Sequence, residues 1–134
     1  MIVAGVADTH AALWYVFDDA RLSARAKQFI DDAAVASRKI AVSIISLAEI
    51  VYLIEKSRLA SSAYDDLKKA LDDPHHVLVE SPVSGEVIEA MRLIPREAVP
   101  DMPDRIAAAT AVSLGVPVIS RDGMIRASSV QTIW

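Results

Sequence analysis

The sequence has no cysteine among its 134 residues, which excludes disulfide bonds and metal sites built on thiolates. A chain without disulfides suits a reducing compartment, and we expect the protein to be cytoplasmic. Three histidines without cysteine cannot supply the ligands of a zinc site at useful spacing. The four glycines form no G-x-x-x-x-G-K-[ST] phosphate loop, and no G-x-S-x-G segment marks a nucleophilic serine.

The sequence also lacks a long apolar run. A membrane-spanning helix needs roughly 18 or more uninterrupted apolar residues. The richest region, from Ile106 to Ile119, is interrupted by Thr110, Ser113 and Gly115. Met1 is followed directly by a strand-like segment with no basic stretch, so we expect neither a signal peptide nor contact with a membrane.

Positive charge is scarce, because the net charge is −4 and no lysine follows Lys69. These features argue against a module that binds nucleic acid through bulk charge. They argue less against a nuclease, because bound cations can offset an acidic site. Receiver domains and haloacid-dehalogenase-type phosphatases also gather acids around Mg²⁺, but both need a lysine late in the chain. The phosphatases also need an Asp-x-Asp pair, where this chain has Asp8-Thr9-His10.

Hydrophobic residues make up 53% of the chain. Segments with the hydrophobic pattern of a strand take turns along the chain with segments that have the pattern of a helix. The chain length predicts a single domain spanning residues 1–134. The order of elements predicts an α/β fold, with a mostly parallel sheet of four to five strands and helices on both faces. We predict strands at residues 2–7, 40–43, 77–79, 116–119 and 130–133. We predict helices at residues 9–17, 23–36, 46–57, 61–72, 84–93 and 104–114, with a loop from Ile94 to Pro103.

Four acidic residues lie where an apolar run ends or a helix begins: Asp8, Glu49, Asp104 and Asp122. If the runs are parallel strands, these carboxylates meet at one edge of the sheet, where open α/β folds bind their ligands. Carboxylates that are close together repel one another unless a divalent cation offsets their charge. The four acids therefore predict a site for a hard metal ion.

Each acid also has an ordinary explanation. Asp8 and Asp104 could simply cap the helices that follow them. Glu49 could be the third-position partner of Ser46 in a capping box, although its helical spacing also allows it to face inward. Asp122 precedes Gly123, a common turn pair. The shared placement of all four favours the metal site over these separate explanations.

Neighbouring polar residues could support such a site. Thr9 and Ser120 carry hydroxyls that could orient a carboxylate or a water molecule, as could Ser46, although a capping role suits Ser46 better. Arg105 and Arg121 each adjoin an acid, and they could either contact a phosphate or screen the acids. His10 adjoins Asp8, but a packed or hydrogen-bonded histidine is the more common finding in the first turn of a helix.

Asp101 and Asp104 both qualify as the third metal ligand. Asp104 directly precedes the apolar helix, whereas Asp101 lies in a loop stiffened by Pro100 and Pro103. We predict that Asp104 binds the metal directly and that Asp101 has a supporting role.

The motifs together resemble those of PIN-domain proteins of the VapC toxin type. The resemblance covers essentially the whole chain and ends with Thr132-Ile133-Trp134. One departure is Ala98-Val99-Pro100, where relatives often carry a His-Arg pair. The matching segments are Asp8-Thr9-His10-Ala11-Ala12-Leu13-Trp14, Ser43-Ile44-Ile45-Ser46-Leu47-Ala48-Glu49-Ile50, Asp101-Met102-Pro103-Asp104-Arg105-Ile106 and Ile119-Ser120-Arg121-Asp122.

This resemblance implies a three-layer α/β/α PIN-like domain and a metal-dependent endoribonuclease, the toxin of a toxin–antitoxin pair. It implies that Asp8, Glu49, Asp104 and Asp122 are the catalytic and metal-binding residues, with Mg²⁺ or Mn²⁺ as the cofactor. The implied partners are an RNA substrate, a cognate antitoxin and a second copy of the chain. The alternative is a PIN-like scaffold that binds RNA or protein with weak or no cleavage, and metal titration separates the two.

The high apolar content also predicts an apolar surface for a partner. We expect Trp14, Tyr15, Tyr52 and Leu53, on early helices near the acids, to contribute to it. An antitoxin segment could place apolar anchors there and project a basic side chain into the acids.

Overall fold

A parallel five-stranded sheet forms the centre of the computed structural model, which describes residues 1–134. The strand order is β3-β2-β1-β4-β5, and every neighbouring pair runs parallel. The predicted parallel sheet is therefore confirmed, with five strands. These strands are β1 (Val3–Ala7), β2 (Lys39–Ser43), β3 (Leu78–Ser81), β4 (Val118–Ile119) and β5 (Thr132–Ile133).

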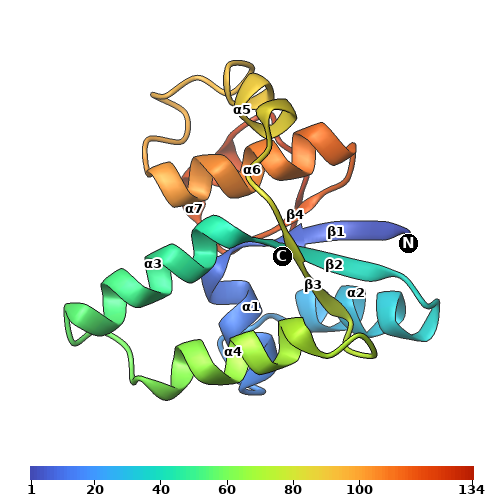
Figure 1. Ribbon diagram of the computed structural model, residues 1–134. Helices are drawn as coiled ribbons and strands as arrows, with labels where there is room; N and C mark the ends of the chain where they lie inside the picture. Colours follow the sequence, from blue (N-terminus) through green and yellow to red (C-terminus); the bar gives the residue numbers. More distant parts are fainter.

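Helices cover both faces of the sheet, giving the three layers of an α/β/α fold (Figure 1). Helices α5, α6 and α7 lie on one face, and α1, α2 and α4 lie on the other. Helix α3 starts at the end of β2 and contacts helices of both layers. The helices are α1 (Thr9–Val16), α2 (Ala24–Val35), α3 (Ile44–Glu55), α4 (Ser62–Asp72), α5 (Gly85–Met91), α6 (Met102–Leu114) and α7 (Gly123–Ala127). None of them has the length and apolar character needed to cross a bilayer.

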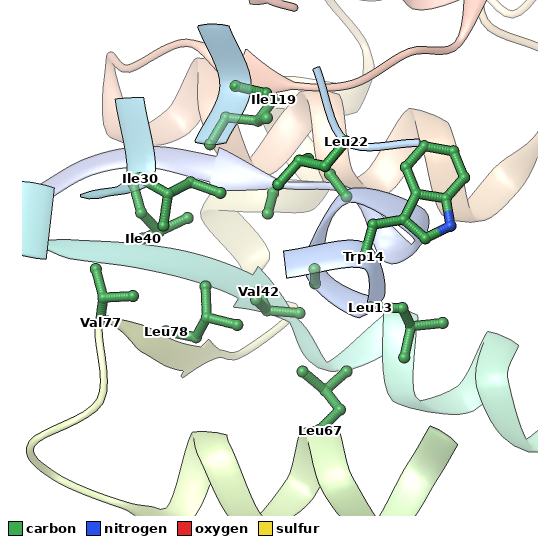
Figure 2. Packing of buried hydrophobic residues seen from close by; sticks show 14 of the residues in the cluster. Leu13, Trp14, Leu22, Ile30, Ile40, Val42, Leu67, Val77, Leu78 and Ile119 are labelled. Atoms are coloured by element: carbon green, nitrogen blue, oxygen red, sulfur yellow. The ribbon is translucent and has the colours of Figure 1, made fainter. Parts of the chain in front are cut away.

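The central strands are buried on both sides, which explains why they are apolar throughout instead of alternating with polar residues. Along β2, Ile40 and Val42 face the core beneath α1, α2 and α4, whereas Ala41 faces the core beneath α5 and α6. Figure 2 shows the first of these cores, where side chains from the sheet meet Leu67 of α4 and Leu13 of α1. Packing on both faces fixes the strand ends that carry the acids.

Two helices start two residues before their predicted first residue. Helix α3 begins at Ile44, and its cap is Ser43, whose Oγ accepts the Ile45 N–H at 3.2 Å. The capping box predicted for Ser46 and Glu49 is therefore wrong, because Ser46 lies inside the first turn and is fully buried.

Helix α6 begins at Met102, two residues before the predicted start, and Asp101 is its cap. Pro103 was predicted to lie in the preceding loop, but it occupies the first turn of α6. The first turn tolerates proline because the N–H that proline lacks has no partner there. The predicted end of this helix is confirmed, since Gly115 follows Leu114 with a left-handed φ of 68°.

Candidate metal centre

The topology places all four predicted acids at the edge of the sheet formed by the carboxyl ends of its strands. Asp8 directly follows β1, and Asp122 lies three residues after the end of β4. Glu49 lies on α3, which begins where β2 ends, and Asp104 lies in the first turn of α6. They line one cleft of about 520 Å³, whose walls are Asp8, His10, Trp14, Arg21, Glu49, Asp101, Asp104, Arg121 and Asp122.

Asp8 forms the floor of the site and is only 6% exposed. Its Oδ1 accepts the Ala11 N–H at 2.9 Å, so it does cap α1. Burial raises the pKa of Asp8 above its ordinary value, and the nearby Ser120 hydroxyl and the Ala11 N–H only partly offset that effect. Capping uses one carboxylate oxygen, so the capping and metal-binding explanations of Asp8 are compatible.

Asp104 is the second acid of the cleft whose pKa is raised. Burial is the main cause, and the negative charges of Asp101, Asp122, Asp8 and Glu49 add to it; together they raise the pKa of Asp104 to about 7. All four of these neighbours line the same cleft. Asp104 is therefore the residue at which the mutual repulsion of the acids is largest.

Asp101 lies beside Asp104 and is exposed. Its Oδ1 accepts the Asp104 N–H at 3.1 Å, which fixes the start of α6 and the backbone of Asp104. The cap of α6 is therefore Asp101, and the capping alternative considered for Asp104 is wrong. The Asp104 side chain remains available to the cleft.

Asp122 lies in a loop that its own hydrogen bonds order. Its N–H donates to the Ser120 Oγ at 3.0 Å, and its Oδ2 accepts the Ile125 N–H at 2.9 Å as the cap of α7. Asp122 thus resembles Asp8 in using one carboxylate oxygen for a helix cap. The other oxygen of each side chain takes no part in that cap.

The donor set fits a hard divalent cation, because it consists of carboxylate oxygens, which Mg²⁺ and Mn²⁺ accept. The histidine in the cleft, His10, is exposed on the first turn of α1. No three of these acidic or imidazole side chains are already placed as ligands of one ion. Binding a cation would therefore require rotation of some side chains, as expected for carboxylates that repel one another.

Three of the predicted supporting residues do not line the cleft. The Thr9 hydroxyl donates to the Ser46 Oγ at 2.8 Å, and both residues are buried behind the acids. Ser120 is fully buried and orders the Asp122 loop. Arg105 points away, where its Nε donates to the Ile94 carbonyl at 3.1 Å and its Nη2 donates to the Met91 carbonyl at 2.9 Å.

Sequence reasoning did not identify Trp14 and Arg21 as part of the site. Trp14 was expected on an apolar partner surface, but it is 7% exposed and belongs to the core (Figure 2). Its ring lies 5.6 Å from that of His10, one helical turn earlier. The expected place of Trp14 near the acids is confirmed, and its spacing of four residues from His10 puts both on one side of α1. Arg21 lies between α1 and α2, and no sequence motif marks it.

The fold is similar to that of several solved structures. The VapBC2 complex of Rickettsia felis, bound to a promoter DNA fragment, is 14% identical, with a TM-score of 0.69 over 98% of this chain and 97% of that chain. FitAcB from Neisseria gonorrhoeae is 18% identical, with a TM-score of 0.60 over 96% and 95%. A toxin–antitoxin complex from Klebsiella pneumoniae is 21% identical, with a TM-score of 0.58 over 92% and 92%. At these identities the similarity establishes the fold alone.

No curated protein matches the sequence. The family model of the PIN domain matches residues 6–129, which include all four acids and the strands β2, β3 and β4. With this match, the parallel sheet and the acidic cleft at its carboxyl edge, the chain belongs to the PIN domain family.

Proposed function

We propose that this protein is a metal-dependent endoribonuclease of the VapC toxin type, which hydrolyses RNA phosphodiester bonds. The observation that carries the proposal is the cleft at the carboxyl edge of the sheet, which gathers the four predicted acids. Burial, with the added charge of four neighbouring acids, raises the pKa of Asp104 there to about 7. A binding scaffold gains nothing from such repulsion, whereas a cation site requires concentrated negative charge.

In this proposal Asp8, Asp104 and Asp122 hold Mg²⁺ or Mn²⁺, and Glu49 binds it directly or through water. When bound, the cation supplies a Lewis acid that activates water for attack on a phosphodiester and offsets the charge of the phosphate. Asp8 and Asp122 keep their positions through the helix caps that they form. Asp101 fixes the backbone of Asp104, and Thr9 and Ser120 support the site from behind it.

We propose that the partner of the protein is an antitoxin. The solved relative from Klebsiella pneumoniae is a toxin–antitoxin complex, and this chain shares its fold, and that of VapBC2 from Rickettsia felis, over more than nine tenths of its length. A cytoplasmic homodimer completes the proposal. The exposed apolar side chains support contacts with partners, since Tyr52 on α3 is 54% exposed and Leu93 after α5 is 72% exposed.

Cleavage of a labelled single-stranded RNA tests the nuclease proposal. We expect cleavage with Mg²⁺ or Mn²⁺, none in EDTA, and a loss of at least about 100-fold in Asp8→Asn and in Asp104→Asn. The amide keeps the shape of the side chain but removes the charge that the cation needs. Asp66→Asn is the matched control, because Asp66 is an exposed aspartate on α4 outside the cleft.

Full activity in EDTA, or in either cleft variant, would overturn the nuclease proposal. RNA binding without cleavage under any metal condition would favour the scaffold function instead. A titration of the wild-type protein with Mn²⁺ alone gives a second readout that needs no substrate. It should show binding that Asp104→Asn weakens and Asp66→Asn leaves unchanged.

A further inference from the structure

Two arginines lie over the ring of Trp14 at the rim of the cleft. The Cζ atom of Arg121 is 4.8 Å from the ring centroid, and that of Arg21 is 5.1 Å from it. All three residues line the same cleft as the acids. The guanidinium groups come from separate parts of the chain, since Arg121 follows β4 and Arg21 precedes α2. Trp14 therefore holds two positive charges beside a strongly acidic site.

The two arginines differ in what they bind. Arg21 forms a two-point ion pair with Asp19, in which Nε lies 3.0 Å from Oδ1 and Nη2 lies 2.7 Å from Oδ2. Its charge is therefore largely offset. Arg121 makes no ion pair or side-chain hydrogen bond, although its chain neighbour Asp122 and four other acids line the same cleft.

An arginine that merely screened the acids would form an ion pair with one of them. Arg121 instead lies against Trp14, whose ring attracts a guanidinium through its negative face. The Trp14 ring is fixed in turn by the core and by Trp134, at 6.0 Å between ring centroids. The five N–H donors of Arg121 are thus held at a defined place and remain free for an acceptor.

We propose that Arg121 binds a phosphate of the RNA strand beside the bond to be cleaved, with Trp14 as the platform that positions its guanidinium. The inference rests on the proposed nuclease function and names the residue that holds its substrate. The fork of the guanidinium matches the paired oxygens of a phosphate. A protein with a net charge of −4 needs such a placed cation to hold a polyanion against an acidic cleft.

The test is the binding of a single-stranded RNA oligonucleotide to Asp104→Asn protein in Mg²⁺, over a series of salt concentrations. Adding Arg121→Ala should weaken binding about tenfold at low salt and reduce the slope of log K against log salt by about 0.7, the value for one phosphate contact on a single strand. Arg121→Lys should restore the slope but only part of the affinity, because lysine keeps the charge and loses the fork. Arg21→Ala should weaken binding less than Arg121→Ala.

The matched control is Arg38→Ala, which changes the net charge equally at the opposite edge of the sheet, just before β2. Arg38→Ala should leave the RNA affinity and its salt dependence near those of the Asp104→Asn protein. In the cleaving protein, Arg121→Ala should raise KM about tenfold and change kcat less than about threefold. A thermal melt should show no loss of folding, because Arg121 is exposed.

Unchanged affinity and slope in Arg121→Ala would overturn the inference, and so would equal losses in Arg121→Ala and Arg38→Ala. Absence of RNA binding by the Asp104→Asn parent at any salt concentration would also overturn it. These results are separate from failure of the nuclease proposal. A wild-type protein that binds RNA through Arg121 but never cleaves it would refute only the nuclease.

Discussion

At the scale of single residues, burial and mutual repulsion disfavour the charged forms of two acids in the cleft, Asp8 and Asp104. Burial and four neighbouring acids raise the pKa of Asp104 from 3.8 to about 7 in the folded protein. Between these values the folded state binds more protons than the unfolded state, so its stability falls as the pH rises from about 4 to about 7. The stored repulsion is thus fully present above pH 7, when no cation is bound.

We therefore predict that Asp104→Asn stabilises the metal-free protein at about pH 8 by about 1–2 kcal/mol. The full shift corresponds to about 4 kcal/mol, and we discount it because Asp104 is partly open to water. Urea unfolding in EDTA at about pH 4 and about pH 8 measures the effect, and the difference should vanish at the lower pH. A lower free energy of unfolding of the variant at about pH 8 would show that the charge of Asp104 does not destabilise the metal-free protein.

Two arginines that look alike in the sequence have different environments in the structure. Arg105 and Arg121 each adjoin an acid in the sequence, and nothing there distinguishes them. The structure separates them, because Arg105 contacts two backbone carbonyls and Arg121 contacts Trp14 in the cleft. The direction of a long side chain depends on packing between distant segments, which no local spacing encodes.

We predict that Arg105→Met destabilises the protein by about 2 kcal/mol, because the Met91 and Ile94 carbonyls lose hydrogen bonds from a charged donor. The RNA affinity of the folded variant should be unchanged. Chemical unfolding and RNA binding should be measured for both variants. Arg105→Met should lose stability and keep its RNA affinity, whereas Arg121→Ala should keep its stability and lose RNA affinity. A loss of RNA affinity in Arg105→Met without a loss of stability would contradict this assignment.

At the scale of elements, helix caps decide where the acids lie. The strand ends and the cap at Asp8 follow from the apolar run that precedes it, and the sequence alone predicts them. The start of α6 does not follow in this way, because the sequence offered Asp104 as the cap and the structure has Asp101 in that position. The choice is set by the fit of α6 against α5 and the sheet, which is a tertiary effect.

We predict that the two substitutions of Asp101 separate its capping role from its charge. Asp101→Ala should lower the free energy of unfolding by about 1 kcal/mol, whereas Asp101→Asn should lower it by only a few tenths, because asparagine caps helices well. Asp101→Asn should weaken cleavage but leave it measurable, whereas Asp104→Asn should abolish it. Cleavage assays that place the larger loss at Asp101 would show that Asp101, not Asp104, is the direct ligand.

At the scale of the whole molecule, one arrangement explains both the fold and the site. A parallel sheet collects the ends of β1, β2 and β4 at one edge, so acids more than 110 residues apart in sequence share a cleft. The opposite edge, with Arg38 and Lys39, carries none of them. The predicted partner surface depends instead on the outer faces of the helices. Of the four residues assigned to it, Trp14 proves to be buried, while Tyr52 is exposed.

Two groups of exposed apolar side chains lie on the outer faces of helices. Tyr52 and Val51 lie on α3, whereas Leu93, Ile88 and Val112 lie over the packed pair α5 and α6. The second group rests on two helices that pack against each other, so it offers a rigid apolar face for a second copy. Helix α3 then remains free for the proposed antitoxin.

We accordingly predict a homodimer that Leu93→Glu dissociates and Tyr52→Glu does not. Burying a carboxylate in an apolar interface without a partner is costly, so the dissociation constant should rise at least about 100-fold. Analytical ultracentrifugation from about 1 to about 100 µM measures it, with Ile88→Glu as a second variant of the same face. A wild-type protein that stays monomeric throughout this range would refute the dimer, and dissociation by Tyr52→Glu alone would place its interface on α3.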